Sequence, residues 1–155
     1  MKILKWSAVV LVILAVGAIV FLRSMGMFAS APVYATAQGA IGGYDPVAYF
    51  DEQKPVKGSA EFTTDWNGAT WYFSSAGRLQ RFQAEPERYA PQFGGYCAMA
   101  VSGGYTAKTD PAAFAIVGDK LYLNFDASVQ QEWNQQRDTL IAQAHKNWPG
   151  VLLGQ

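Results

Sequence analysis

The sequence predicts an α+β fold: a small single domain of short β-hairpins packed with short helices and a long C-terminal helix, preceded by one N-terminal transmembrane helix. Three observations predict this class. Two pairs of β-favouring runs flank tight-turn dipeptides, helix-start signals stand between them, and a long uncharged apolar run stands near the N-terminus. A chain of 155 residues has the length of one domain, and we find no internal repeat in it.

The apolar run covers residues 6–22, which carry no charge. A helix that spans a membrane needs ~17–25 such residues. Lys2 and Lys5 precede the run, so the positive-inside rule places the N-terminus in the cytoplasm. A cleaved signal peptide ending near Ala31 or Ala35, which would give a secreted product, is the competing interpretation. We favour an anchor over 1–23, in a single-pass inner-membrane protein whose domain lies in the periplasm or outside the cell.

The rest of the chain divides by composition. Many of residues 24–40 are small or polar, which predicts a tether. We expect residues 41–149 to form the domain and residues 150–155 to form a tail. Outside the N-terminal cations Lys2, Lys5 and Arg23, 9 basic and 12 acidic residues remain. A mildly acidic domain argues against a nucleic-acid partner, whereas a protein partner in the periplasm is compatible with it.

The domain begins with Asp45-Pro46, an N-cap followed by proline, which predicts a helical turn through Phe50. Residues 61–64 and 69–73 favour strands, and Asn67-Gly68 between them is a hairpin signal.

Ser74 or Ser75 then caps a helix to about Gln83, and Pro86 starts a further turn through Tyr89. The short apolar stretch 96–100 is compatible with either helix or strand.

Asp110-Pro111 repeats the cap-plus-proline signal, and Gly118-Asp119 predicts a second hairpin between 114–117 and 120–124. The last element is the longest, a helix from Asp126 or Ser128 to about Lys146. Its apolar face consists of Val129, Trp133, Leu140 and Ala144.

Three segments, 43–50, 71–75 and 91–98, carry a family resemblance. Asp45-Pro46-Val47-Ala48, Tyr72-Phe73-Ser74 and Pro86-Glu87-Arg88-Tyr89 resemble motifs of the YHS-domain family, a group of small domains related to cysteine-based heavy-metal sensors and carriers. The resemblance covers roughly residues 41–149 and implies the fold of that family.

The chain departs from the metal-binding relatives at their cysteine positions, which correspond here to Ala48, Ser74 and Arg78. Soft metals such as Cu(I) and Zn(II) bind thiolate or imidazole ligands. Alanine has no ligand atom, serine is a poor ligand, and arginine repels cations. We therefore expect the family's metal site to be lost in this chain.

Cys97 is the only cysteine and His145 the only histidine, while Met99 follows Cys97 by two residues. Thiolate, thioether and imidazole groups suit a soft metal ion, so these three residues are our candidate metal ligands, with copper as the first candidate. Two interpretations compete with this one: Cys97 as a small buried core residue, and Cys97 as a reactive thiol, alone or activated by His145.

Tyr44, Tyr96 and Tyr105 stand beside glycines and are our candidates for the lining of a ligand site. The sequence thus favours a non-catalytic module outside the cytoplasm that binds a metal ion or small ligand. A structural or protein-interaction module without a metal site and a thiol-dependent redox protein that uses Cys97 are the alternatives.

Overall fold

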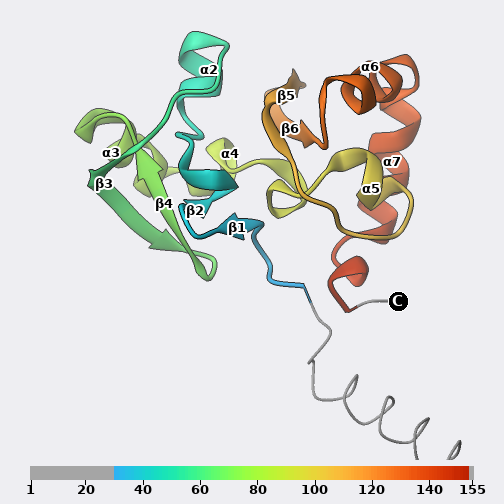
Figure 1. Cartoon of the computed structure of the whole chain (residues 1–155), viewed down its shortest axis with the longest axis horizontal. Coiled ribbons are helices and arrows are strands. Elements are labelled where there is room, and N and C mark those ends of the chain that lie inside the picture. Colours follow the sequence, from blue (N-terminus) through green and yellow to red (C-terminus); the bar gives the residue numbers. More distant parts are fainter. Residues whose placement is uncertain (1–29, 154–155) are drawn as a thin grey trace, which may run out of the picture.

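The computed structural model describes residues 30–153 and shows an α+β domain of short hairpins and helices (Figure 1), which confirms the predicted class of the domain. The strands are β1 (Ala35–Thr36), β2 (Gly39–Ala40), β3 (Ser59–Trp66), β4 (Ala69–Phe73), β5 (Asp110–Val117) and β6 (Lys120–Asn124). The α-helices are α2 (Ala48–Glu52), α3 (Ala76–Ala84), α4 (Pro86–Tyr89), α5 (Ala98–Ser102), α6 (Ala127–Gln135) and α7 (Arg137–Asn147). The 3₁₀ helices are η1 (Ile41–Gly43), η2 (Gln92–Gly95) and η3 (Gly150–Leu153).

Both predicted hairpins form, with β3 antiparallel to β4 and β5 antiparallel to β6. The turn residues have positive φ angles, 51° at Asn67 and 80° at Gly68 in the first hairpin, 55° at Gly118 and 58° at Asp119 in the second. Glycine, asparagine and aspartate adopt this left-handed conformation most easily, which is why the two dipeptides specify tight turns.

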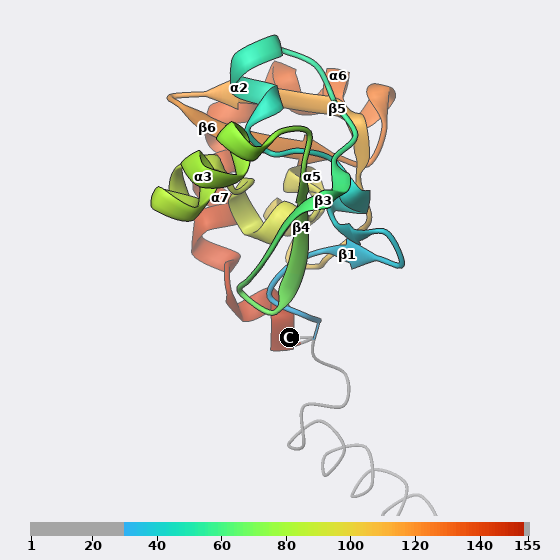
Figure 2. The same cartoon turned by 90° about the vertical axis from the view of Figure 1, so that its left-hand side faces the viewer.

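The order and the lengths of the elements repeat along the chain. β3 and β5 have 8 residues each, β4 and β6 have 5, α3 and α6 have 9, and α2 and α5 have 5. Gly42-Gly43-Tyr44 precedes one set and Gly94-Gly95-Tyr96 the other. We name residues 41–84 the first unit and 93–135 the second; they lie side by side (Figures 1 and 2). The repeat is one of structure, and beyond the triplet the units share little sequence, which is why the sequence shows no internal repeat.

The predicted helix after the first hairpin is confirmed as α3, and the Ser75 hydroxyl accepts the Arg78 N–H at its N-terminus. The single long C-terminal helix is wrong, because Gln136, with φ −135°, separates α6 from α7. Between Trp133 and Leu140 the chain is polar and exposed, so no buried side chain holds that stretch in one continuous helix.

Asp110-Pro111 begins a strand, not the predicted helical turn. The Asp110 carboxylate still accepts a backbone N–H, that of Ala112 at 2.8 Å, since an aspartate can form this local bond in a turn as well as at a helix start. The stretch 96–100, compatible with either state, enters α5.

Residues 30–40 pack on the domain, so the predicted tether over 24–40 is wrong for this part. Val33 is 2% exposed, the Tyr34 N–H donates to Gly94 O, and the Ser30 N–H donates to Leu152 O. The predicted tail likewise forms η3 and buries Val151. The described chain therefore enters beside its C-terminal end (Figure 2). The predicted anchor at residues 6–22 lies outside the described residues. Within 30–153 no helix has the length and hydropathy to cross a membrane.

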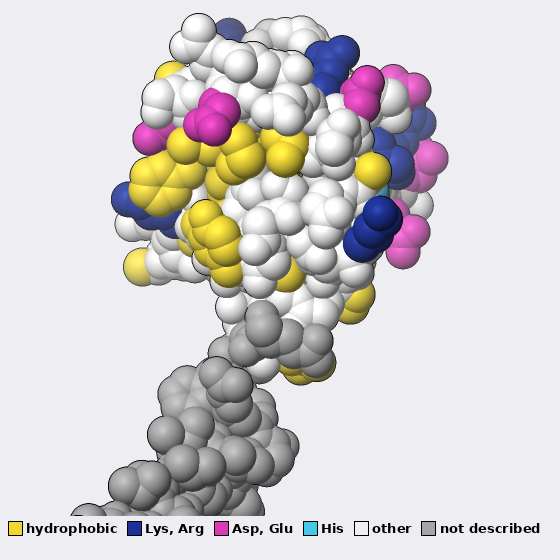
Figure 3. All heavy atoms as spheres, turned by 90° about the vertical axis from the view of Figure 1, so that its right-hand side faces the viewer, with side chains coloured by type: hydrophobic (Ala, Val, Ile, Leu, Met, Phe, Trp, Pro, Cys, Tyr) yellow, Lys and Arg dark blue, Asp and Glu magenta, His cyan; other side chains and the backbone are white. Residues whose placement is uncertain are grey.

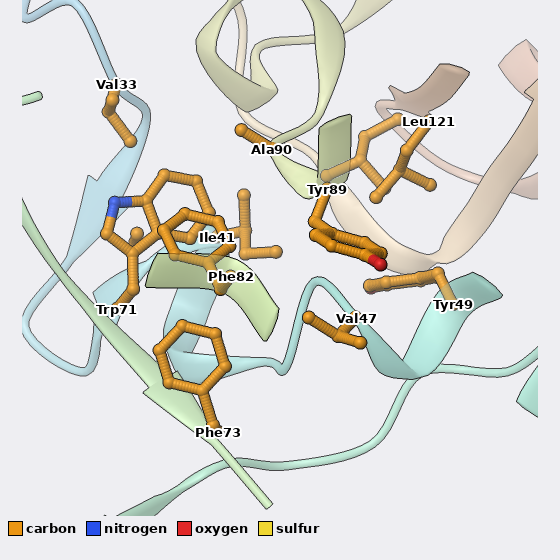
Figure 4. Packing of buried hydrophobic residues seen from close by; sticks show 12 residues of the cluster. Val33, Ile41, Val47, Tyr49, Trp71, Phe73, Phe82, Tyr89, Ala90 and Leu121 are labelled. Carbon is orange, nitrogen blue, oxygen red and sulfur yellow. The ribbon is translucent and has the colours of Figure 1, made fainter. Parts of the chain in front are cut away.

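Two apolar clusters make up the core. In the first, Trp71, Phe73 and Phe82 pack with ring centroids 5.1–5.2 Å apart, and Tyr49 and Leu121 extend the cluster toward the second unit (Figure 4). The second cluster surrounds Trp133, Tyr122 and Phe93. The second hairpin thus contributes to both clusters, since Leu121 and Leu123 lie in the first and Tyr122 lies in the second.

Candidate functional site

Asp45 is a fully buried carboxylate just before α2. Its Oδ1 accepts the backbone N–H groups of Val47 at 2.9 Å and Ala48 at 3.3 Å, so the predicted capping role is present. Its Oδ2 accepts both the N–H and the hydroxyl of Ser74, each at 2.8 Å. One carboxylate therefore ties the start of α2 to the residue that follows β4.

Arg78, which lies on α3, completes this group of hydrogen-bonded side chains. Its Nη1 lies 3.6 Å from Asp45 Oδ2 and donates to Ser74 Oγ at 2.6 Å, while Nε and Nη2 donate to Asp51 and Glu52. Burial opposes the charged guanidinium, but the Glu52 hydrogen bond and the charges of Asp45 and Asp51 outweigh it, so the pKa of Arg78 is raised. We name Asp45, Asp51, Glu52, Ser74 and Arg78 the Asp45–Arg78 network.

The three positions that correspond to the family's cysteines meet in this network, but their side chains do not fit a metal ion. Ala48 contributes a methyl group, the Ser74 hydroxyl is already bonded to Asp45, and Arg78 brings a positive charge to the site. In residues 30–153 no group of three or more His, Cys, Asp or Glu side chains is arranged to hold a metal ion. The donor set supports the expectation that the family's metal site is lost.

Cys97 is 2% exposed, and its thiol donates to Asn124 Oδ1 at 3.7 Å. Burial raises the pKa of the thiol, although the backbone N–H groups of Ala100, Phe125 and Met99 act in the opposite direction. The thiol is thus neutral and enclosed, as expected for the core residue among our three interpretations of Cys97.

The other two candidate metal ligands have different surroundings. Met99 is half-buried against the second cluster, and its N–H donates to Asn124 Oδ1 at 3.2 Å. His145 is exposed on α7, with its ring 5.1 Å from the Phe93 ring in an edge-on arrangement. No hydrogen bond joins Cys97 to His145 anywhere in the described chain. A copper site on these three residues stays a prediction.

The three candidate tyrosines are spread over the surface and the core. Tyr44 is half-buried beneath the Lys57 ammonium, 4.2 Å from its ring centroid. The Tyr96 hydroxyl donates to Ala31 O at 2.9 Å, and Tyr105 is 59% exposed. They do not line a common hollow among the pockets of the described chain.

A different cleft, of about 280 Å³, opens where the N-terminal segment, the first hairpin turn, the connection between the units and the end of α7 meet. Trp71 and Val33, which belong to the buried cluster of Figure 4, line its buried part, and Trp66 and Trp148 are half-buried lining residues. The residues that line it are Pro32, Val33, Trp66, Asn67, Trp71, Glu87, Ala90, Pro91, Gln92, Phe93, Gly94, His145 and Trp148. We name it the aromatic cleft.

The aromatic rings of the cleft hold one another in place. Trp66 lies 5.9 Å from Trp71, and Phe93 lies 6.0 Å from Trp148, in tilted or edge-on pairs. Gly94 makes this close packing feasible, because a Cβ there would overlap the Pro32 carbonyl and press on the Trp148 ring, and its φ is +62°. The cleft is therefore preformed by packed side chains and by a backbone approach that only glycine permits.

The cleft has a biased charge. Glu87 is its only lining residue with a formal charge, apart from the titratable His145, and it is exposed. No ion pair in the described part of the chain uses Glu87, whereas Glu85 on the same turn pairs with Arg88. Asn67, Gln92 and the Pro32 backbone add polar groups at the rim. Trp66 and Trp148 were not among the predicted site residues, and their positions at the ends of β3 and α7 were the available signal.

An exposed apolar surface lies away from the cleft, on the connections around the second hairpin. Tyr105 is 59% exposed and Phe125 39% exposed, with the Lys108 ammonium 5.1 Å from the Phe125 ring centroid. Figure 3 shows hydrophobic side chains gathered on one part of this side of the molecule, while most charged side chains lie along the opposite edge of the view.

The protein is thus a small α+β domain of two units with a preformed cleft. Residues 47–93, which include most of the first unit, match the model of the YHS domain family. The family resemblance is confirmed there. No curated protein and no solved structure matches the chain.

Proposed function

We propose that the protein is a non-catalytic binding module that takes a small ligand in the aromatic cleft, and that a membrane anchor at residues 6–22 holds it outside the cytoplasm. The observation that carries the proposal is the cleft itself: it is preformed, lined by two half-buried tryptophans and a buried third, with polar groups at its rim. Such hollows, mainly apolar with a few polar groups, are the usual form of ligand sites.

A YHS domain is consistent with a metal-related module, but the side chains favour the small-ligand form of the proposal. At the family's cysteine positions the network is complete within the protein, since Asp45, Asp51 and Glu52 all bond to Arg78 or Ser74. A metal ion there would have to displace the guanidinium. The carboxylates of the network are therefore structural partners and are not available as metal ligands.

The burial of Cys97 also argues against a thiol-dependent redox function. A reactive cysteine is accessible and has a lowered pKa, whereas this thiol is 2% exposed and its pKa is raised. We expect iodoacetamide to modify Cys97 at least about a hundredfold more slowly in the folded protein than in urea. Comparable modification rates in the folded protein and in urea would favour the redox hypothesis.

The cleft proposal can be tested without knowing the ligand. The full chain, purified in a maltoside detergent, is screened by ligand-observed NMR against small cations, anions and neutral aromatic compounds. We expect at least one class to bind, and we expect Gln92→Trp, which fills the cleft, to abolish binding. Gln131→Trp, on the exposed side of α6, is the matched control. If no class binds, or if Gln92→Trp binds as well as the control, the cleft is not the functional site.

The proposed location has its own test. A reporter that is active only outside the cytoplasm, fused after residue 155, should be active and should fractionate with membranes. Activity in the soluble fraction would support the cleaved alternative, and inactivity would contradict export.

A protein-interaction module is the second candidate, and the exposed Tyr105 and Phe125 favour it. If a partner protein covers this surface, photo-crosslinking from position 105 in cells should give a discrete adduct that Phe125→Ser removes. Crosslinking from position 131, on α6, is the control.

A further inference from the structure

We propose that the aromatic cleft binds a small organic cation of the alkylammonium class, a ligand whose positive nitrogen lies between the tryptophan faces near Glu87. This inference rests on the proposed function and names the class of its ligand. Three features of the cleft carry it: the kind of ring in its walls, the sign of its charge, and its size.

The first feature is the kind of aromatic ring in the walls of the cleft. Indole is the aromatic group that attracts cations most strongly, because the face of its ring carries negative electrostatic potential. Trp66 and Trp148 reach the cleft from distant segments, one from the first hairpin and one from the end of α7, and both are only half-buried. Trp71 and Phe93 lie behind them and hold their orientation. Aromatic groups on several sides of one hollow are the arrangement that recognises quaternary ammonium groups.

The charges of the residues that line the cleft also favour a cation. Apart from His145, no basic side chain is among the lining residues, and Glu87 is the one lining carboxylate. Its neighbour Glu85 is neutralised by Arg88 at 3.2 Å, but within residues 30–153 no cation pairs with Glu87. A cleft with one unpaired carboxylate and aromatic walls attracts a cation and repels an anion.

The volume limits the ligand. About 280 Å³ lies just below the usual range for sites that enclose drug-sized ligands, so the cleft suits a headgroup or a small metabolite rather than a nucleotide or a large cofactor. The ammonium group has two sources, a free solute or the headgroup of a lipid. The chain reaches the cleft at Pro32, shortly after the predicted anchor, which makes the lipid source geometrically reasonable.

The test compares a cation with a neutral molecule of the same shape. The full chain in a maltoside detergent is titrated with choline and with 3,3-dimethylbutan-1-ol, in which carbon replaces the charged nitrogen, and binding is followed by calorimetry and tryptophan fluorescence. We expect choline to bind with a Kd on the order of 1 mM or below and the neutral alcohol to bind at least about tenfold more weakly. Equal binding of the two, or no binding of choline, overturns the proposal.

Two variants locate the site. Glu87→Gln should weaken choline binding about two- to fivefold, and Glu85→Gln, on the same turn but outside the cleft, should leave it unchanged. Trp148→Leu keeps an apolar wall without the indole and should weaken binding about tenfold. Because Glu87 is exposed, its substitution tests the proposal even if Trp148→Leu does not fold. Unchanged choline binding by Glu87→Gln and by a folded Trp148→Leu places the cation elsewhere and overturns the proposal.

Bilayers distinguish the two sources. The choline titration is repeated in phosphatidylcholine and in phosphatidylglycerol nanodiscs. A weaker apparent affinity in phosphatidylcholine alone means that the lipid headgroup competes for the cleft, and equal affinity means that a free solute is the ligand. If only anions or neutral compounds bind in the broad screen described above, the cation proposal fails while the cleft remains the binding site.

Discussion

Asp45 in the first unit and Cys97 in the second occupy equivalent positions, each directly after a Gly-Gly-Tyr triplet. Asp45 accepts the N–H groups of the second and third residues after it and of the residue that follows β4. For Cys97, the N–H groups of the second and third residues after it and of the residue that follows β6 likewise act on the sulfur and favour its ionised form. The same backbone arrangement thus surrounds a carboxylate in one unit and a thiol in the other.

The difference between the units follows from the third residue of the next helix. In α3 this residue is Arg78, whose guanidinium lies 3.6 Å from Asp45. In α6 it is Val129, which has no charge, although its N–H is capped by Asp126 just as the Arg78 N–H is capped by Ser75. A buried carboxylate needs a cation, and a thiol does not. The comparison explains why a neutral residue stands at position 97.

The largest effect that the comparison predicts is that of Asp45→Ala. It removes the acceptor for three backbone N–H groups and leaves the Ser74 hydroxyl and Arg78 without their buried partner. We expect the free energy of unfolding to fall by about 3–5 kcal/mol in urea titrations of the full chain. Asp110→Ala, which removes one exposed bond of the same kind, should cost about 1 kcal/mol or less. Equal losses in the two variants would contradict a central role for Asp45.

Placing the first unit's residue in the second unit should be the next most costly change. Cys97→Asp puts a carboxylate beside Asn124 Oδ1 with no arginine nearby, so we expect a loss of about 2–3 kcal/mol at pH 8. The folded-state pKa of this carboxyl would lie above its unfolded value, so the loss should shrink as the pH falls toward 5.

Cys97→Ala, which removes the sulfur without adding charge, should cost only about 1 kcal/mol and show no such pH dependence. The double variant Cys97→Asp with Val129→Arg should recover part of the loss. If Cys97→Asp is as stable as the natural protein, the backbone N–H groups alone suffice for a carboxylate and the comparison fails.

Arg78→Met should have a somewhat smaller effect, about 2 kcal/mol, because it leaves Asp45 its backbone bonds but removes its cation. Thermal unfolding of the full chain measures this loss. Arg88→Met is the matched control, since Arg88 pairs only with the exposed Glu85, and it should change little. A loss no greater than that of the control would make the guanidinium dispensable.

The smallest expected effect on stability is that of Glu52→Gln. The Arg78 hydrogen bond, followed by that of Lys54, lowers the pKa of this exposed carboxyl. Its folded pKa is below the unfolded value, so its contribution is present at neutral pH and is lost as the pH falls through the folded pKa. Glu52→Gln should therefore unfold at a slightly lower temperature than the natural protein at pH 7 and at the same temperature near pH 3. A constant difference across this range would mean that the carboxylate charge is not involved.

Local signals predicted most of the fold. Asn67-Gly68 and Gly118-Asp119 specify hairpins through their own conformational preferences, and Asp45 and Ser75 cap as their side chains allow. The resemblance also indicated which residues would meet around Arg78.

Features that depend on contacts across the chain were missed. The break at Gln136 and the packing of residues 30–40 depend on which side chains find a core, and periodicity does not report this. The cleft needs Trp66 and Trp148 from distant segments to meet, and nothing near either residue encodes that approach.

The contact of Pro32 with Gly94 also determines how the domain bears mechanical force. A pull on the chain where it enters at residue 30 would act first on the bonds from Ser30 to Leu152 and Thr106 and from Ala31 to Tyr96, and then on the bond from Tyr34 to Gly94. Pro32, Val33 and Gly94 all line the cleft, whereas the Asp45–Arg78 network lies further along the load path. If the proposed anchor holds the chain in a membrane, tension on it would act on the cleft before the first unit, and release of a ligand from the cleft would then depend on force.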